Sequence, residues 1–78
     1  MLITYDPLAN VAYISIVEGA QPGGEAGNQE IVGEDIVLDY DDDGKLLGIE
    51  ILNARNLLRS EVLLEAKRMV ADMEEQLS

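Results

Sequence analysis

The sequence predicts an α+β fold class, a four-stranded antiparallel β-meander packed against a C-terminal amphipathic helix. Two observations predict it. Residues 2–52 contain short runs of β-branched and aromatic residues separated by Asp, Pro and Gly, which is typical of strands joined by turns. Residues 60–77 change to apolar side chains at three- and four-residue steps, which indicates a helix. With 78 residues, the chain is expected to form a single domain, residues 1–78.

The first expected element is a hairpin. Residues 2–5 form one strand, Asp6 and Pro7 favour a turn, and residues 11–17 form a second strand rich in β-branched residues. Residues 18–28 are rich in Gly and interrupted by Pro, so they are expected to form an exposed loop. These glycines lack the spacing of a phosphate-binding loop, and no Gly-Lys-Ser/Thr follows them.

A second hairpin is predicted from residues 31–40 and 45–52, because Asp41-Asp42-Asp43-Gly44 between them is a strong turn signal. An odd-length loop would place Asp35 and Asp39 on the apolar face, and burying unpaired carboxylates is costly. We therefore expect an even loop of two or four residues. With such a loop, one face of the hairpin, the inner face, carries Ile36, Leu38, Tyr40, Leu47, Ile49 and Ile51. The outer face then carries Asp35, Val37, Asp39, Leu46, Gly48, Glu50 and Leu52.

The C-terminal helix is predicted over residues 60–77. Ser60 can act as its N-cap, and Glu61 suits the positive end of the helix dipole. The apolar stripe consists of Val62, Leu63, Ala66, Met69, Val70, Met73 and Leu77. A chain this short forms a small core, and the strands carry apolar residues on both faces. We therefore expect a homodimer.

Composition argues against several classes of function. The formal net charge is −11, with only 5 Lys and Arg, whereas nucleic acids and anionic membranes attract clustered basic residues. The absence of Cys and His excludes thiol catalysis, an imidazole base and an ordinary zinc site. We expect no catalytic residue, cofactor or metal. No signal peptide or membrane span is visible, so we expect a cytoplasmic protein without membrane or nucleic-acid partners.

One alternative is a cation-binding module. Asp39, Asp41, Asp43, Gly44 and Glu50 match the spacing of an EF-hand calcium loop. An EF-hand loop lies between two helices, whereas the residues on both sides of this one are predicted to be strands. A weak cation site on the aspartates of the turn is the form of this alternative that the predicted hairpin allows.

A second alternative is a small acid/base enzyme. It would use the outer-face carboxylates Asp35, Asp39 and Glu50 together with Tyr13. Carboxylates on an open sheet face are usually solvated, and catalysis needs groups that converge in a cavity. Glu50 is expected to pair with Arg55, with Arg59 or with an arginine of a partner.

Several segments resemble a small bacterial domain-of-unknown-function family, number twenty-two eighty-three, over residues 2–54. They are Tyr5-Asp6-Pro7, Ala12-Tyr13-Ile14, Leu38-Asp39-Tyr40-Asp41-Asp42-Asp43-Gly44 and Gly48-Ile49-Glu50-Ile51-Leu52. The resemblance implies a β-meander followed by a helix, a dimer and no established activity. Members are similar to small partner proteins encoded beside toxin-like genes, which implies an antitoxin-like role.

The residues and the resemblance together predict an uncharacterised acidic protein-interaction module. It is expected to act as a homodimer and as an antitoxin-like partner of a basic protein, which its negative charge would attract.

Overall fold

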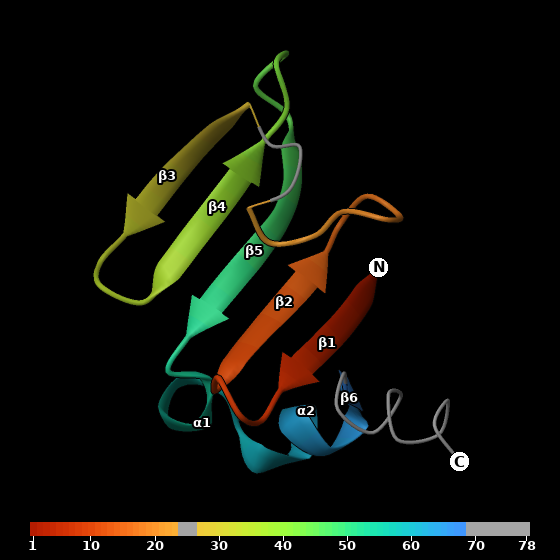
Figure 1. Ribbon diagram of the computed structural model, residues 1–78, viewed down its shortest axis with the longest axis vertical. Helices are drawn as coiled ribbons and strands as arrows, with labels where there is room; N and C mark the ends of the chain where they lie inside the picture. Colours follow the sequence, from red (N-terminus) through yellow and green to blue (C-terminus); the bar gives the residue numbers. More distant parts are fainter. Residues whose placement is uncertain (24–26, 69–78) are drawn as a thin grey trace.

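The structure is a computed structural model that describes residues 1–23 and 27–68 (Figure 1). Its centre is a twisted sheet with the strand order β3-β4-β5-β2-β1-β6. Five strands pair in antiparallel fashion: β1 (Leu2–Asp6), β2 (Val11–Ser15), β3 (Asn28–Val32), β4 (Ile36–Tyr40) and β5 (Leu46–Leu52). The short β6 (Lys67–Arg68) runs parallel to β1. The helices are α1 (Ala54–Leu57) and α2 (Ser60–Glu65).

The α+β class and the antiparallel sheet are confirmed, but the prediction of four strands is wrong. The expected strand 31–40 is two strands, β3 and β4, which pair with each other. The chain reverses at the turn 33–35, where Gly33 has a φ of +65° that glycine adopts without steric cost. Because β3 begins at Asn28, the glycine-rich loop ends one residue earlier than predicted.

The strand order also differs from a meander. β2 pairs with β5 and not with the next strand in the sequence, so the loop after β2 carries the chain across the sheet to its far edge (Figure 1). This arrangement places Ala12 opposite Ile51 and Tyr13 opposite Glu50. The two predicted hairpins therefore meet through their second strands, which become the centre of the sheet.

The β4–β5 hairpin keeps the predicted inner face over most of its length but not the predicted loop. Ile36 lies opposite Ile51 and Leu38 opposite Ile49, so these four residues share a face, as expected. Near the loop the prediction is wrong, because Tyr40 pairs with Leu46, which was expected on the outer face. The loop is odd: Asp41 N–H donates to the Lys45 carbonyl at 2.8 Å, so three residues form its tip. A bulge absorbs the extra residue, because Asp39 pairs with Gly48 while Tyr40 pairs with Leu46. An odd loop is therefore compatible with the apolar pattern of the strands.

The helical prediction is only partly correct. Helix α2 ends at Glu65, because Ala66 is extended and residues 67–68 form β6, so a continuous helix over 60–77 is wrong. Residues 69–78 lie outside the described residues. The N-cap of α2 is Arg59, and Ser60 is already helical. None of the described helices is long and apolar enough to cross a membrane.

The apolar core lies on one face of the sheet, which we call the helix face and define by Tyr5, Ala12 and Ile51. The buried side chains Leu63 and Ala66, which belong to α2 and the residue after it, pack against this face. The helices lie at one end of the sheet, near the β1–β2 turn (Figure 1). The described helices therefore cover mainly β1, β2 and β5, and β3 is exposed along its whole length.

Asn10 connects the β1–β2 turn to α1. Its Oδ1 accepts hydrogen bonds from Tyr5 Oη at 3.2 Å and from the Arg55 N–H at 2.9 Å, and its carbonyl accepts one from the Ala54 N–H. Asn10 and Asn53 both adopt left-handed backbone conformations, which asparagine tolerates better than most residues. This contact fixes the position at which the chain leaves the sheet for the helices.

Candidate functional site

The face opposite the helix face carries a buried polar cluster. We call it the loop face and define it by Thr4, Tyr13 and Glu50, which lie side by side on β1, β2 and β5. Tyr13 Oη donates a hydrogen bond to Asp39 Oδ2 at 2.9 Å, and Gln29 Nε2 donates one to Asp39 Oδ1, also at 2.9 Å. Asp39 is only 1% exposed, yet each of its oxygens has a partner. The cluster links β2, β4 and β3 across the sheet.

Gly48 makes this cluster possible. The Tyr13 ring crosses β5 above Gly48 to reach Asp39 on the next strand. A Cβ at position 48 would overlap the ring and would lie 2.8 Å from Tyr13 Cε2, closer than such atoms approach. Glycine is therefore required here because the aromatic ring occupies the space of a side chain.

Glu50 is the second carboxylate of the cluster. It lies opposite Tyr13 on β2 and Val37 on β4 and is half-buried. Desolvation by burial, followed by the charge of Asp39, raises the pKa of Glu50 above its ordinary value. Neither Arg55 nor Arg59 contributes to this shift, so the expected pairing of Glu50 with one of them is not found among the described residues.

Tyr13 is held in its protonated form. Burial raises the pKa of the Tyr13 hydroxyl strongly, and the hydrogen bond to Asp39 and the charges of Asp39 and Glu50 raise it further. The hydroxyl therefore donates to Asp39 over the whole ordinary pH range and does not act as a base near neutrality.

The structure brings together three of the four residues of the predicted acid/base set: Tyr13, Asp39 and Glu50. Asp35 is apart from them, because it lies in the turn before β4, four residues from Asp39. The expectation that Asp39 is solvated is wrong, because the side chain is buried and Tyr13 and Gln29 occupy its two oxygens. Sequence reasoning also missed Gln29, since β3 was not predicted to begin before residue 31.

The residues with calcium-loop spacing are separated by the hairpin. Asp39 binds Tyr13 and Gln29, whereas Asp41 Oδ1 accepts from the N–H groups of Asp43 and Lys45 at 2.9 Å each. These bonds shape the tip of the turn. Within residues 1–23 and 27–68, no three potential ligands lie close enough to hold a metal ion.

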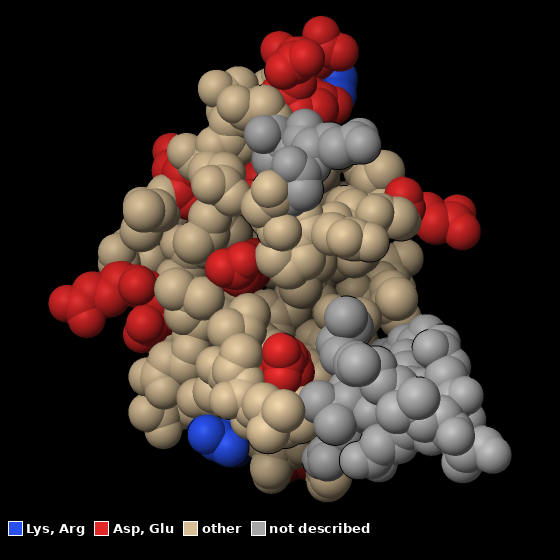
Figure 2. Space-filling model, in the orientation of Figure 1, with Lys and Arg blue, Asp and Glu red and all other residues tan. Residues whose placement is uncertain are grey.

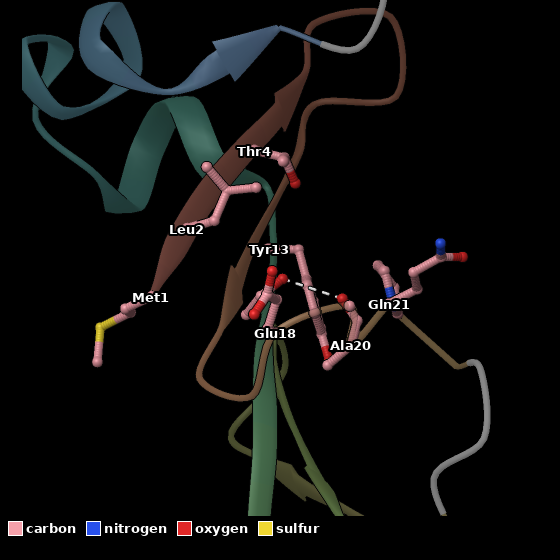
Figure 3. A pocket seen from close by; sticks show the side chains of 10 residues that line it. Met1, Leu2, Thr4, Tyr13, Glu18, Ala20 and Gln21 are labelled. Carbon is pink, nitrogen blue, oxygen red and sulfur yellow. Dashed lines mark hydrogen bonds between the residues drawn. The ribbon is translucent and has the colours of Figure 1, made fainter.

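A groove runs along β1 and β2 on the loop face. Its larger part, about 550 Å³, lies between these strands and loop residues 18–22 (Figure 3). Its smaller part, about 290 Å³, reaches Glu50 and Asp6, and Thr4, Tyr13 and Pro22 line both parts. Ser15 Oγ donates a hydrogen bond to the Ala20 carbonyl at 2.9 Å, which holds the loop above the strands (Figure 3). The loop thus turns a sheet face into a groove.

Comparison with known proteins assigns the chain to a family. The family described as Protein of unknown function (DUF2283) matches residues 2–55. The chain belongs to this family. The matched span contains the five antiparallel strands, and therefore Tyr13, Asp39, Gly48 and Glu50, while α2 and β6 lie beyond it. Neither the curated proteins nor the solved structures contain a match.

Proposed function

We propose that this protein is a non-enzymatic protein-interaction module that acts in the cytoplasm as a homodimer and binds a basic protein, in the manner of an antitoxin. The observation that carries the proposal is the solvent exposure of β3 at the edge of the sheet. All five of its residues are exposed, including Ile31 at 70% and Val32 at 46%. In the described residues, β3 ends the sheet on its outer side, so its backbone groups there have no strand partner.

An exposed edge with apolar side chains favours pairing with another strand. Soluble proteins usually protect such an edge with Lys, Pro or a bulge, and Asn28-Gln29-Glu30-Ile31-Val32 contains neither Lys nor Pro. A second copy of the chain offers the same edge, and two β3 strands related by a twofold axis pair in antiparallel fashion. Such pairing would continue the sheet and cover Ile31 and Val32.

Charge makes the two interactions respond oppositely to salt. Two copies that each carry a net charge of −11 repel one another, so salt screening should strengthen the homodimer. A basic partner is attracted by the same charge, so salt should weaken that complex. The direction of the salt effect therefore distinguishes the two associations.

A single exposed side chain tests the homodimer. Sedimentation equilibrium should detect a dimer that strengthens between about 0.05 M and about 0.5 M salt. Ile31→Lys places a charge on the edge and should give a monomer. Leu64→Lys is the matched control, because Leu64 is 72% exposed on α2, and it should leave the dimer intact. Equal association of Ile31→Lys and the unmodified chain would contradict the proposal.

The second candidate function is an acid/base enzyme, and the observation in its favour is the raised pKa of Glu50 beside a groove. Against it, Tyr13 is committed to Asp39 and stays protonated. Both oxygens of Asp39 accept hydrogen bonds from Tyr13 and Gln29. The cluster then leaves Glu50 without a second proton-exchanging group beside it, which supports the interaction module over the enzyme.

A further inference from the structure

The groove on the loop face combines apolar walls with carboxylates. Leu2, Val11 and Pro22 contribute apolar surface along its length. Glu18 lies at one part of the groove, and Glu50 and Asp6 line the other. Within residues 1–23 and 27–66, the residues that line it include no Lys or Arg. The groove therefore presents negative charge next to surfaces that an aliphatic chain can cover.

Asp39 is close enough to Glu50 for its charge to act on the Glu50 carboxylate. The carboxylates of Asp39 and Glu50 repel each other, and this repulsion adds to the burial that disfavours the charged form of Glu50. On this face, the Lys and Arg side chains that Figure 2 shows in blue lie near the ends of the molecule, away from its middle. A cation brought to Glu50 from outside would relieve the repulsion.

We infer that the groove is a docking site for a lysine or arginine side chain carried by an extended segment of a basic protein. The aliphatic stem would lie along Val11 and Pro22, and the cationic head would bind the Glu50 carboxylate. Long basic side chains bury their methylene groups on apolar surface in this way while the head binds a charged acceptor. This inference rests on the basic partner of the proposed function and identifies the surface that it contacts.

The size and position of the groove suit this occupant. The part of the groove that contains Val11, Pro22 and Glu50 has a volume of about 290 Å³, close to the lower end of the range of sites that enclose a small ligand. The groove runs along β1 and β2, so an extended segment can follow it with alternate side chains directed inward. It is separate from the β3 edge at the other end of the sheet, so self-association and docking do not compete for one surface.

Calorimetric titration with a short peptide tests the inference. The probe is the acetylated and amidated tripeptide Ala-Arg-Ala, and its matched control carries citrulline, a neutral isostere of arginine. At low salt, the arginine peptide should bind, and the citrulline peptide should bind at least about tenfold more weakly, because a hydrogen bond to a charged group is lost.

Two variants of the chain locate the binding. Glu50→Gln removes the proposed acceptor with little change of shape and should weaken binding of the arginine peptide by about tenfold. Glu34→Gln removes the same charge from the exposed β3–β4 turn and should change binding less than about twofold. Equal losses in the two variants would show general attraction and would overturn the inference. Thermal unfolding of both variants shows that they remain folded.

Two further titrations test whether the cation that binds Glu50 comes from a basic protein, from Lys67 of the chain itself or from a free polyamine. β6 pairs the backbone of Lys67 with Thr4 beside the groove. Unchanged binding by Lys67→Ala supports docking from outside, whereas binding that tightens about tenfold would assign the cation to the chain itself and overturn the inference. Spermidine that binds as tightly as the arginine peptide would assign the groove to a free polyamine and would also overturn it.

The result of the peptide titration can be distinguished from the result of the homodimer test. A chain that sediments as a dimer but binds no arginine peptide would refute the docking site and leave the homodimer standing. A monomer that binds the peptide through Glu50 would do the opposite.

Discussion

The two faces of this sheet are buried by different means. On the helix face, Tyr5, Ala12 and Ile51 form an apolar core with Leu63 of α2. On the loop face, the most buried large side chain is the carboxylate of Asp39, held by hydrogen bonds from Tyr13 and Gln29. The helix face is stabilised by the hydrophobic effect and by packing, whereas the loop face is stabilised by hydrogen bonds. Among the described side chains, every buried polar atom has a hydrogen-bond partner.

This difference has a physical consequence for specificity. Apolar packing accepts many side chains of similar volume, so the helix face tolerates conservative exchange. A buried carboxylate requires particular donors at particular positions, and removal of one donor leaves an unsatisfied charge. The loop face therefore favours the observed neighbours, because the order β3-β4-β5-β2 brings Gln29, Asp39 and Tyr13 together.

The largest effect is expected on the helix face. Ile51→Ala removes a buried side chain from the centre of the core and should lower the free energy of unfolding by about 2–5 kcal/mol. Leu38→Ala, on the same face of β4, is the comparison, because Leu38 is only half-buried and should cost less. Urea denaturation measures both. Equal losses would mean that the core extends over β4 as fully as over β5.

An intermediate effect is expected on the loop face from Gly48→Ala. The added methyl group overlaps the Tyr13 ring and should lower the free energy of unfolding by about 1–3 kcal/mol. A double-mutant cycle with Tyr13→Leu sharpens the comparison, because the smaller side chain should remove most of the penalty. If Gly48→Ala lowers the free energy of unfolding as much in the Tyr13→Leu chain as in the unmodified chain, the loss comes from the backbone of β5. The role assigned to Tyr13 is then wrong.

The smallest effect concerns the charge of Glu50. Its pKa is raised in the folded chain, so the folded state binds a proton more readily than the unfolded state and loses stability as the pH rises through that pKa. Glu50→Gln removes this loss and should stabilise the chain at neutral pH on the order of 0.5 kcal/mol. The advantage should fade as the pH falls below about 4.3, the ordinary glutamate value, where both side chains are neutral.

Thermal unfolding of the two chains at several pH values measures this difference. A Glu50→Gln chain that is less stable than the unmodified chain at neutral pH would indicate that Glu50 has a cationic partner within the protein.

Local patterns were sufficient for the hairpins. The turn residues Asp6 and Pro7, together with the β-branched run after them, predicted β1 and β2. The alternation along β4 and β5 predicted that Leu38 and Ile49 share a face, and the pairing of these two residues confirms it even though the loop is odd. Both features depend on residues close in sequence, whose spacing is visible without any knowledge of the fold. A bulge can absorb one residue, which is why the shared face was predictable while the loop length was not.

The turn at Gly33 was the main local signal that the prediction did not use. A glycine followed by Glu34 and Asp35 is a turn signature, and it divides the expected third strand into β3 and β4. Its consequences are not local, because β3 supplies both Gln29 and the exposed edge on which the proposed homodimer depends. The helix prediction failed for another reason: apolar spacing continues beyond Glu65, but pairing of β6 with β1 overrides that pattern.

The sequence by itself determined the α+β class, the two hairpins, the acidic charge and the family, because composition, period and motif are properties of the chain alone. Only the tertiary structure decided that β5 lies beside β2, that Gly48 makes room for Tyr13, and that Asp39 is buried. These features join residues far apart in the chain: Tyr13 and Asp39 are separated by 26 positions. An outward-facing carboxylate is normally solvated, and Asp39 becomes a buried acceptor because distant strands bring the donors Tyr13 and Gln29 to it.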